Sequence, residues 1–344
     1  MSQEMTAEKM MEYLYELPAQ FRAGLEMDFS LARAHKKEYE NVVVSGLGGS
    51  AIGGDILRTY ALQKAAVPIL VNRDYGCPAF VNDKTLFLAV SYSGNTEETL
   101  SSFEEAHRKG ARIICITSGG KLEKMAAENN DPVVKVPGGL VPRAATGYLF
   151  APLALLMEHL GILTGISGEI EETAAVLEEM RNKLNPGVSP ADNPAMKIAR
   201  KIKGSIPVIW GTAGISEAAA LRWKAQINEN AKSPAYYNVF PELNHNEIVG
   251  FETPASLLPN LSIIILRDRF DNERVKKRIE ISSGIIRERV KNLIEVESRG
   301  NSWLARFYSL TYTGDYASVY LALEYGLNPT PVAVIDYLKN ELAK

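Results

Sequence analysis

Short apolar runs alternate with amphipathic segments along most of the chain, and this alternation begins twice. The runs are too short for core helices and are rich in β-branched residues, so they predict buried strands. The predicted strands are Asn41–Val44, Val67–Asn72, Thr85–Val90, Ala111–Thr117 and Val133–Val136 in the first half, and Ile206–Trp210, Leu261–Leu266 and Leu293–Glu297 in the second.

The segments between these runs repeat their apolar positions every three or four residues, which predicts helices. Strands that alternate with helices form parallel sheets covered by helices on both faces. We therefore expect an α/β fold of two three-layer α/β/α sandwich domains with mainly parallel sheets, related as a diverged duplication. The predicted helices are 52–63, 97–109, 121–129 and 142–160 in the first half, and 217–230, 273–290, 304–325 and 331–342 in the second.

Residues 164–196 mark the expected boundary between the domains. An acidic amphipathic helix, Glu169–Leu184, leads there into a segment rich in proline, glycine and asparagine, which is typical of a linker. The chain begins with amphipathic segments interrupted near Pro18, which we expect to pack on the first domain. We therefore predict a helical leader (1–35), a first domain (36–163), a helix with a linker (164–196) and a second domain (197–344).

The composition narrows the class of protein. With 46% hydrophobic and 23% charged residues, the chain has the balance of a soluble globular protein. Its net charge of -3 gives no polybasic signature, so we expect neither nucleic acid nor membrane as a partner. The most apolar window, Tyr148–Met157, is too short to span a bilayer, and we see no signal peptide. Cys77 and Cys115 are too few for a metal cluster and suit a reduced cytoplasm.

A loop rich in hydroxyl groups follows the predicted strand Thr85–Val90. It contains Ser91, Ser93 and Thr96, and Thr96 is placed to cap the helix that comes next. The first N–H groups of a helix have no internal partners and carry the positive end of its dipole, so such a loop suits a phosphate. An ordinary capped turn is the alternative for this loop taken alone.

A second loop, residues 45–50, follows the predicted strand Asn41–Val44 and is rich in glycine. Residues 46–51 match the loose dinucleotide fingerprint G-x-G-x-x-A, and Asp74 lies where a ribose-binding acid could fall. A dinucleotide site needs only this loop, whereas a small phosphorylated ligand held by both loops explains more of the sequence. After Leu266 the second half has no hydroxyl-rich loop, so we expect one phosphate site, in the first half.

Several motifs resemble a known family. Residues 44–54 (VSGLGGSAIGG), 91–99 (SYSGNTEET) and 142–145 (PRAA) are similar to a sugar isomerase (SIS) domain. Residues 228–232 (NENAK), 241–246 (PELNHN) and 329–339 (PTPVAVIDYLK) narrow the resemblance. From about residue 40 onward, the chain resembles the bifunctional phosphoglucose/phosphomannose isomerases, a family with two SIS domains.

This resemblance implies an isomerase that interconverts glucose 6-phosphate and mannose 6-phosphate with fructose 6-phosphate. It implies a homodimer in which a histidine reaches the partner's site, and it calls for no metal and no cofactor. The implied phosphate contacts are Gly48, Gly49, Ser50, Ser91, Ser93 and Thr96. The implied residues at the reacting end are Arg143 near the reacting carbons, Glu229 as the catalytic glutamate, His245 for ring opening and Lys339 as the C-terminal lysine.

The chemistry of isomerisation can be compared with these residues. The reaction opens the sugar ring and moves a proton between C1 and C2 through an enediol, which requires a general base and stabilisation of the enediolate. Glu229 follows Leu221 and Ala225 at four-residue spacing, so it continues an apolar stripe near a helix end and would be partly buried. A solvated glutamate at a fraying helix end is the alternative.

The other three residues have alternatives of the same kind. His245 lies in a polar loop after Pro241, where an imidazole could reach a ligand. Arg143 fits enediolate stabilisation beside two phosphate loops, or it is a surface charge at a helix start. Lys339 lies on an amphipathic helix, where lysine is usually solvated, so only the resemblance recommends it.

One departure from the family pattern concerns substrate range. Some members place a threonine, tied to accepting both C2 epimers, at the position that counting assigns to Val332, whereas Thr330 lies two residues earlier. The sequence therefore supports glucose 6-phosphate more firmly than mannose 6-phosphate. A non-enzymatic phosphosugar-binding SIS module and an NAD-dependent oxidoreductase remain as alternative functions.

Overall fold

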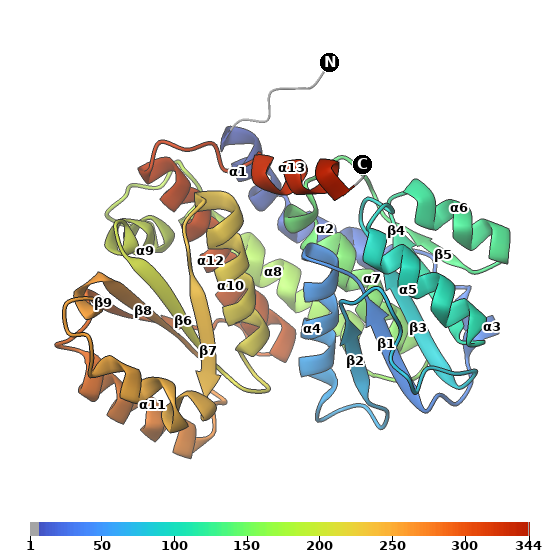
Figure 1. Ribbon diagram of the computed structural model, residues 1–344, viewed down its shortest axis with the longest axis horizontal. Helices are drawn as coiled ribbons and strands as arrows, with labels where there is room; N and C mark the ends of the chain where they lie inside the picture. Colours follow the sequence, from blue (N-terminus) through green and yellow to red (C-terminus); the bar gives the residue numbers. More distant parts are fainter. Residues whose placement is uncertain (1–6, 343) are drawn as a thin grey trace. The chain divides into compact units, whose positions relative to one another are not determined.

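The computed structural model describes residues 7–342 and 344, and the chain forms two compact units. The first-sheet unit comprises Glu16–Glu178 with Gly300–Arg306, and the second-sheet unit comprises Glu179–Arg299 and Phe307–Lys344 with the N-terminal helix α1 (Ala7–Tyr15). Each unit contains one parallel sheet with helices packed against it (Figure 1). The α/β class predicted from the sequence is confirmed.

The first sheet is entirely parallel and has the strand order β2-β1-β3-β4-β5. Its central strand β3 is buried along its whole length, as its continuous apolar sequence predicts. Every strand predicted for the first half is present. The strands are β1 (Asn41–Ser45), β2 (Ile69–Asn72), β3 (Thr85–Val90), β4 (Arg112–Thr117) and β5 (Val133–Lys135).

Helices cover both faces of this sheet, because alternate residues of each strand point to opposite sides. On one face Phe87 and Ile113 pack with Phe103 of α5 and Leu122 of α6. On the other face α4 lies so close to β1 that a Cβ at Gly54 would come within 2.9 Å of Val44 Cγ1. The helices of this unit are α2 (Leu17–Leu25), α3 (Ala32–His35), α4 (Gly49–Ala61), α5 (Glu97–Arg108), α6 (Gly120–Asn129), the 3-10 turn η1 (Pro142–Ala144), α7 (Thr146–His159) and most of α8 (Ile166–Leu184).

The N-terminal segment divides between the two units. As expected of a leader on the first domain, α2 packs on α7, and a Cβ at Gly24 would lie only 2.7 Å from Ala151 Cβ. The helix α1 belongs instead to the second-sheet unit, where the Tyr312 hydroxyl donates to the Leu14 carbonyl at 2.7 Å. The expectation that the whole leader packs on the first domain is therefore wrong for α1.

The second sheet is also parallel and has the order β7-β6-β8-β9. This order repeats that of the first four strands of the first sheet, which agrees with the expected duplication. The strand β7 was not predicted, because it is an edge strand with a mixed polar sequence (YYNVF) and exposed tyrosines. The strands are β6 (Ile206–Thr212), β7 (Tyr236–Phe240), β8 (Leu261–Arg267) and β9 (Asn292–Glu297).

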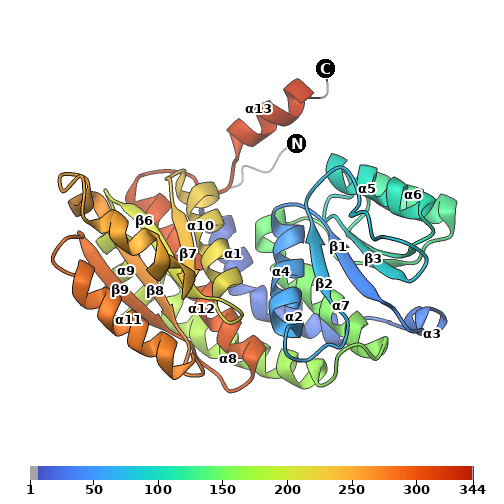
Figure 2. The same ribbon diagram turned by 60° about the horizontal axis from the view of Figure 1, so that its bottom comes forward.

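The helices of the second-sheet unit pack on both faces of its sheet, and Figure 2 shows α11 on one face and α10 and α12 on the other. The last helix, α13, has no buried residue. Among the described residues, no helix is long and apolar enough to cross a bilayer. The helices are α9 (Pro194–Ile202), α10 (Glu217–Ala231), α11 (Glu273–Ile286), α12 (Trp303–Glu324) and α13 (Ala333–Leu342), with the 3-10 turns η2 (Glu242–His245), η3 (Glu247–Phe251) and η4 (Leu258–Asn260).

Candidate functional site

The two loops predicted to bind phosphate lie side by side at the carboxyl edge of the first sheet. They follow β1 and β3, which are neighbours in the sheet. The backbone N–H of Tyr92 donates to Ser50 Oγ at 3.2 Å, and a Cβ at Gly46 would lie 2.8 Å from the Val90 carbonyl oxygen. The carboxyl edge of a parallel sheet is where α/β proteins bind ligands. The first-sheet unit therefore brings the two predicted phosphate loops into contact.

The loop after β3 is held by its own hydroxyl groups. Ser91 Oγ and Thr96 Oγ1 lie 2.9 Å apart, and the N–H of Asn95 donates to Ser93 Oγ at 3.2 Å. Gly94 has a φ of +67°, and a Cβ there would collide with the Gly119 carbonyl, so the tight turn requires glycine. The loop thus presents Ser93 to solvent while its anchor, Ser91, is buried.

Thr96 occupies the N-cap position of α5, as predicted, but its side chain makes no cap hydrogen bond to the helix. Its hydroxyl pairs with Ser91 instead, so the expected capping interaction is wrong. The N–H groups of the first turn of α5 are consequently not occupied by Thr96. Together with the hydroxyls of the loop, they form the kind of environment that binds a phosphate.

The loop after β1 leads directly into α4. Gly48 has a φ of +52° and open space where a Cβ would lie, and the helix begins at Gly49. A Cβ at Gly49 would lie 2.7 Å from the Pro142 carbonyl oxygen and 3.3 Å from the Arg143 nitrogen. Close backbone approach therefore explains the glycine at 49. The same approach places the Arg143 backbone against this loop.

Arg143 is buried, with 5% of its surface exposed, in the 3-10 turn η1. A buried guanidinium is costly unless it is paired or meets a charged ligand, so a surface charge at a helix start is excluded for this residue. Arg143, the 46–50 loop and the 91–96 loop all belong to the first-sheet unit. Three of the sequence-predicted elements therefore meet at one edge of one sheet.

Glu229 belongs to the second-sheet unit and lies in the last turn of α10. It is half-buried, and so are Leu221 and Ala225, the residues that precede it at four-residue spacing. The predicted partial burial is thus observed. The core-facing side of α10 lies next to this stripe and includes Trp223 and Ile227.

His245 and Glu229 lie at opposite edges of the second sheet. Since β6 and β7 are parallel, α10 runs from the carboxyl edge to the amino edge, and β7 runs back. Glu229 precedes β7, and the exposed His245 follows it in η2. The five residues of β7 span about 17 Å at the usual rise per residue. One chain therefore does not bring these two side chains together.

Lys339 lies on α13, where it is exposed. The segment before α13 passes the end of α10, because Lys232 Nζ donates to the Pro329 carbonyl at 2.9 Å. Thr330 in this segment is buried, with 1% of its surface exposed, whereas Val332 is half-buried. The base of the C-terminal segment and Glu229 consequently lie at the same end of the second-sheet unit.

Lys232 itself was missed by the sequence reasoning. It follows α10 with a left-handed φ of +54°, and its ammonium group bonds to the carbonyl oxygens of both Glu229 and Pro329. The second partner is 97 positions away in the chain. No local pattern could have indicated that contact.

In the second sheet, the loops that correspond to the phosphate loops follow β6 and β8. Ser216 Oγ there accepts the N–H of Thr212 at 2.8 Å, and Asp268 and Asp271 are almost fully buried. Burial raises the pKa of the Asp271 carboxyl above its ordinary value. Two carboxyl groups at this place would repel a phosphate when ionised. This arrangement favours a single phosphate site, in the first-sheet unit.

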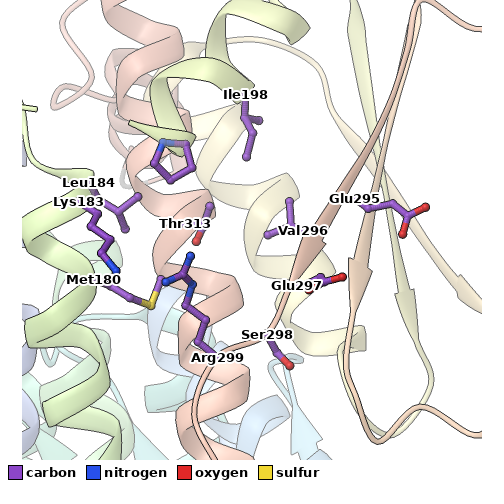
Figure 3. Close-up of a pocket in the computed structure, with 11 residues that line it drawn as sticks. Met180, Lys183, Leu184, Ile198, Glu295, Val296, Glu297, Ser298, Arg299 and Thr313 are labelled. Carbon is purple, nitrogen blue, oxygen red and sulfur yellow. The ribbon is translucent and has the colours of Figure 1, made fainter. Parts of the chain in front are cut away.

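A cavity of about 370 Å³ opens in the second-sheet unit beside the end of β9 (Figure 3). None of the residues predicted to act on a ligand lines it, so the cavity gives no information about their chemistry. Within the described part of the chain, no three His, Cys, Asp or Glu side chains are grouped as a metal site would require. The cavity is lined by Met180, Lys183, Leu184, Pro194, Ile198, Glu295, Val296, Glu297, Ser298, Arg299 and Thr313.

Comparisons with known proteins agree with the duplicated fold. Residues 38–133 match the family model described as SIS domain, and residues 191–342 match the one described as bacterial phospho-glucose isomerase C-terminal SIS domain. The C-terminal domain of glucosamine-fructose-6-phosphate aminotransferase from Francisella tularensis superposes with a TM-score of 0.68 at 16% identity, covering 94% of this chain and 98% of that one. That likeness shows a shared fold.

Two relatives are similar over almost their whole length. A bifunctional phosphoglucose/phosphomannose isomerase from Caldicellulosiruptor bescii is 48% identical over 336 residues, which cover 97% of this chain and 99% of the relative. A protein of the same name from Aquifex aeolicus is 38% identical over 307 residues, which cover 89% of this chain and 91% of the relative.

Proposed function

Because the chain belongs to the bifunctional phosphoglucose/phosphomannose isomerase family, we propose that it interconverts glucose 6-phosphate and mannose 6-phosphate with fructose 6-phosphate. The structural observation that carries this proposal is the meeting of the 46–50 loop, the 91–96 loop and Arg143 at one edge of the first sheet. Glycine, hydroxyl groups and a buried cation in that arrangement suit a ligand with a phosphate at one end.

The substrate phosphate is held by the loops. The backbone N–H groups of Gly48 and Gly49 and the hydroxyls of Ser50, Ser93 and Thr96 act as its donors, with Ser91 supporting Thr96 at 2.9 Å. The loops do no chemistry on the sugar, because the phosphate is remote from C1 and C2. Their interactions with the phosphate hold the reacting carbons in place.

The reaction on the carbons requires one base and one cation. In the open-chain aldose, the Glu229 carboxylate removes the proton from C2 while the C1 carbonyl oxygen gains negative charge, which forms an enediolate. The same proton is then returned to C1, while the proton of the C2 hydroxyl is transferred to the C1 oxygen. The C2 oxygen thereby becomes the carbonyl of the ketose, and the C1 oxygen becomes a hydroxyl. Arg143 stabilises the enediolate charge. Electrons move only within the substrate, so the reaction uses no external oxidant.

Ring opening precedes this step and requires proton transfer at the ring oxygen and the C1 hydroxyl. We assign it to His245, because an imidazole has one ring nitrogen that can donate a proton and one that can accept it. Since His245 and Glu229 of one chain lie at opposite edges of the second sheet, a complete site takes them from different chains. This supports a homodimer with shared sites. Lys339 completes the reacting end as a second cation from α13.

The substrate range turns on the segment before α13. Thr330 is the buried threonine of this segment, and Val332 occupies the position that counting from the family pattern gives. We propose that Thr330 takes the role of the family threonine, so that both C2 epimers are accepted. A mutation of Thr330 to valine should then reduce turnover of mannose 6-phosphate more than that of glucose 6-phosphate.

A coupled assay with each hexose 6-phosphate, with fructose 6-phosphate as the product measured, tests the proposal directly. We expect turnover of both. A thermal-shift series with 6-phosphogluconate, fructose 6-phosphate and NAD accompanies it, and the two sugar phosphates should stabilise the protein. Stabilisation by NAD alone would favour an oxidoreductase, and sugar-phosphate binding without turnover would favour a non-catalytic binding module.

A further inference from the structure

The helix that carries Glu229 is fixed to α12 by buried polar contacts. Asp315 of α12 accepts from Arg222 at 2.8 Å and from Gln226 at 2.9 Å. One turn further along α10, Asn230 donates to Ser318 Oγ at 2.9 Å. Each of these side chains is buried, so α10 cannot rotate about its axis without leaving buried polar groups unpaired. The end of α10 beside Glu229 is therefore held in one orientation.

Lys232, the residue that follows α10, has an unusual backbone conformation. Lys232 has a φ of +54°, a region that residues with a Cβ rarely adopt. Where a residue with this conformation ends a helix, it is usually glycine. Among the described residues only one other non-glycine residue, Asn130, has a positive φ, and asparagine tolerates it better than lysine. The backbone at 232 would accept glycine, so the local fold does not require a side chain there.

The Lys232 side chain makes two main-chain contacts. Its ammonium group donates to the Glu229 carbonyl, one of the last carbonyls of α10, which have no partner within the helix. It also donates to the Pro329 carbonyl at 2.9 Å. Pro329 is buried and adjoins Thr330, and α13 begins only a few residues later, at Ala333. One cation thus links the last turn of the Glu229 helix to the base of the segment that carries Lys339.

We infer that Lys232 is a positioning residue, which holds the Pro329–Thr330 segment against the end of α10 and so fixes the distance between Glu229 and the C-terminal groups. This inference rests on the proposed function, in which Glu229 is the base and Lys339 acts from α13. Lys232 touches no substrate atom in this role. It acts through the two carbonyl groups to which it donates.

The expected effect lies in kcat rather than in KM. In the proposed function the phosphate loops, which belong to the first-sheet unit, provide most of the ground-state binding, whereas Lys232 belongs to the second-sheet unit. Misplacing the base by a fraction of an ångström affects the proton transfer, and an error of 1 Å can cost about a hundredfold in rate. For loss of one tether we expect a decrease of about tenfold in kcat, with KM changed less than about twofold.

Lys232→Gly and Lys232→Asn test the inference, because both residues accept a positive φ and neither reaches Pro329. Since glycine relieves the backbone conformation, Lys232→Gly should melt within a few degrees of the native protein. Both variants should show the lower kcat and faster amide hydrogen exchange over residues 326–332. The matched control is Lys291→Ala, because Lys291 also donates to two main-chain carbonyls, those of Lys203 and Gly204, at 2.8 Å and 3.3 Å. It should keep the native kcat.

Native kcat in a folded Lys232→Gly variant, or unchanged exchange over 326–332, would overturn the inference. Glu229→Gln, measured in parallel, separates this outcome from failure of the proposed function. If Glu229→Gln is inactive and Lys232→Gly is fully active, only the positioning role is wrong. If Glu229→Gln retains native turnover, the assignment of the base is wrong, and the exchange measurement still decides whether Lys232 holds the segment.

Discussion

Glu229 lies half-buried in the last turn of α10, beside a stripe of residues that share its exposure. Sequence spacing alone predicted this placement, because residues four apart on a helix lie on one face. What the spacing could not indicate is the fixed register of the helix, which depends on Asp315 of a distant helix. At the scale of the residue, the half-buried position of Glu229 was predictable from the sequence, and the contacts with Asp315 that fix its helix were not.

Replacing Glu229 by glutamine removes the proposed base while keeping the size and shape of the side chain. We expect kcat for glucose 6-phosphate to fall by about three orders of magnitude, which is within the usual range for loss of a general base. Steady-state kinetics with a circular-dichroism check of folding would measure it. Glu217→Gln, at the other end of the same helix, serves as control and should keep native activity. Near-native turnover by a folded Glu229→Gln would rule out this role.

The buried Asp271 should make the stability of the fold depend on pH. Burial raises the pKa of its carboxyl in the folded protein above its ordinary value of 3.8. The folded state therefore holds this proton more strongly than the unfolded state, so ionisation destabilises the fold as pH rises from 3.8 through the raised pKa. The destabilisation is fully present above the raised pKa.

Asp271→Asn should accordingly increase the free energy of unfolding at pH 8, and the gain should shrink as the pH approaches 4. Urea denaturation of both proteins at several pH values measures this difference. The exposed Asp83, changed to asparagine, is the control and should show no such dependence. A gain that grows toward low pH would contradict the assigned direction of the pKa shift.

At the scale of the element, the functional interpretation of the loops after β1 and β3 depends on their contact with each other. Each loop alone is compatible with an ordinary turn. Tyr92 contacts Ser50, and Gly49 closely approaches the Arg143 segment. These contacts bring three separate motifs together at the carboxyl edge of the first sheet. The sequence predicted that the loops meet, because neighbouring parallel strands end together. It did not predict that Arg143 would be buried.

The helix α13 is amphipathic yet has no buried residue, and its large apolar side chains include Val334, Tyr337 and Leu338, each more than half exposed. Helices of this length are marginal in water without tertiary packing. Because it contributes no buried side chain to the second-sheet unit, its removal should leave the fold of the unit intact.

Deleting residues 333–344 should therefore leave the melting temperature almost unchanged while lowering kcat/KM by at least about a hundredfold, because the proposed cation Lys339 is lost. Differential scanning fluorimetry and the coupled assay measure the two effects. Lys339→Met in the full chain isolates the charge from the rest of the helix. If the truncated protein and Lys339→Met both keep native activity, Lys339 has no part in the reaction.

At the scale of the whole molecule, the two sheets repeat one order of strands but differ in the residues at their carboxyl edges. The first presents glycine and hydroxyl groups at its carboxyl edge, whereas the second presents the buried Asp268 and Asp271. The residues that we propose for the second half lie elsewhere, with Glu229 at the amino edge and His245 at the carboxyl edge of its sheet. That division leads to the proposed sharing of sites between two chains.

Mixed dimers test the sharing. Homodimers of Glu229→Gln and of His245→Ala should each be nearly inactive. If the two residues of a site come from different chains, refolding an equal mixture yields heterodimers with one intact site, and about a quarter of native activity should return by random pairing. Size-exclusion chromatography confirms the dimers. No recovery from well-mixed, folded dimers would show that each chain supplies its own pair.

The sequence by itself determined the α/β class, eight of the strands, the contact between the two loops predicted to bind phosphate and the half-buried placement of Glu229. These features follow from hydrophobic periodicity and turn chemistry, which are local. It missed β7, because an edge strand with a mixed polar sequence shows little alternation. It also missed α9, although Ala195, Ile198 and Ile202 have helical spacing, because the helix directly follows the segment interpreted as a linker. Only the tertiary structure decided what depends on contacts between distant segments. Those contacts give the burial of Arg143, place α1 with the second sheet, separate Glu229 from His245, and link Lys232 to Pro329.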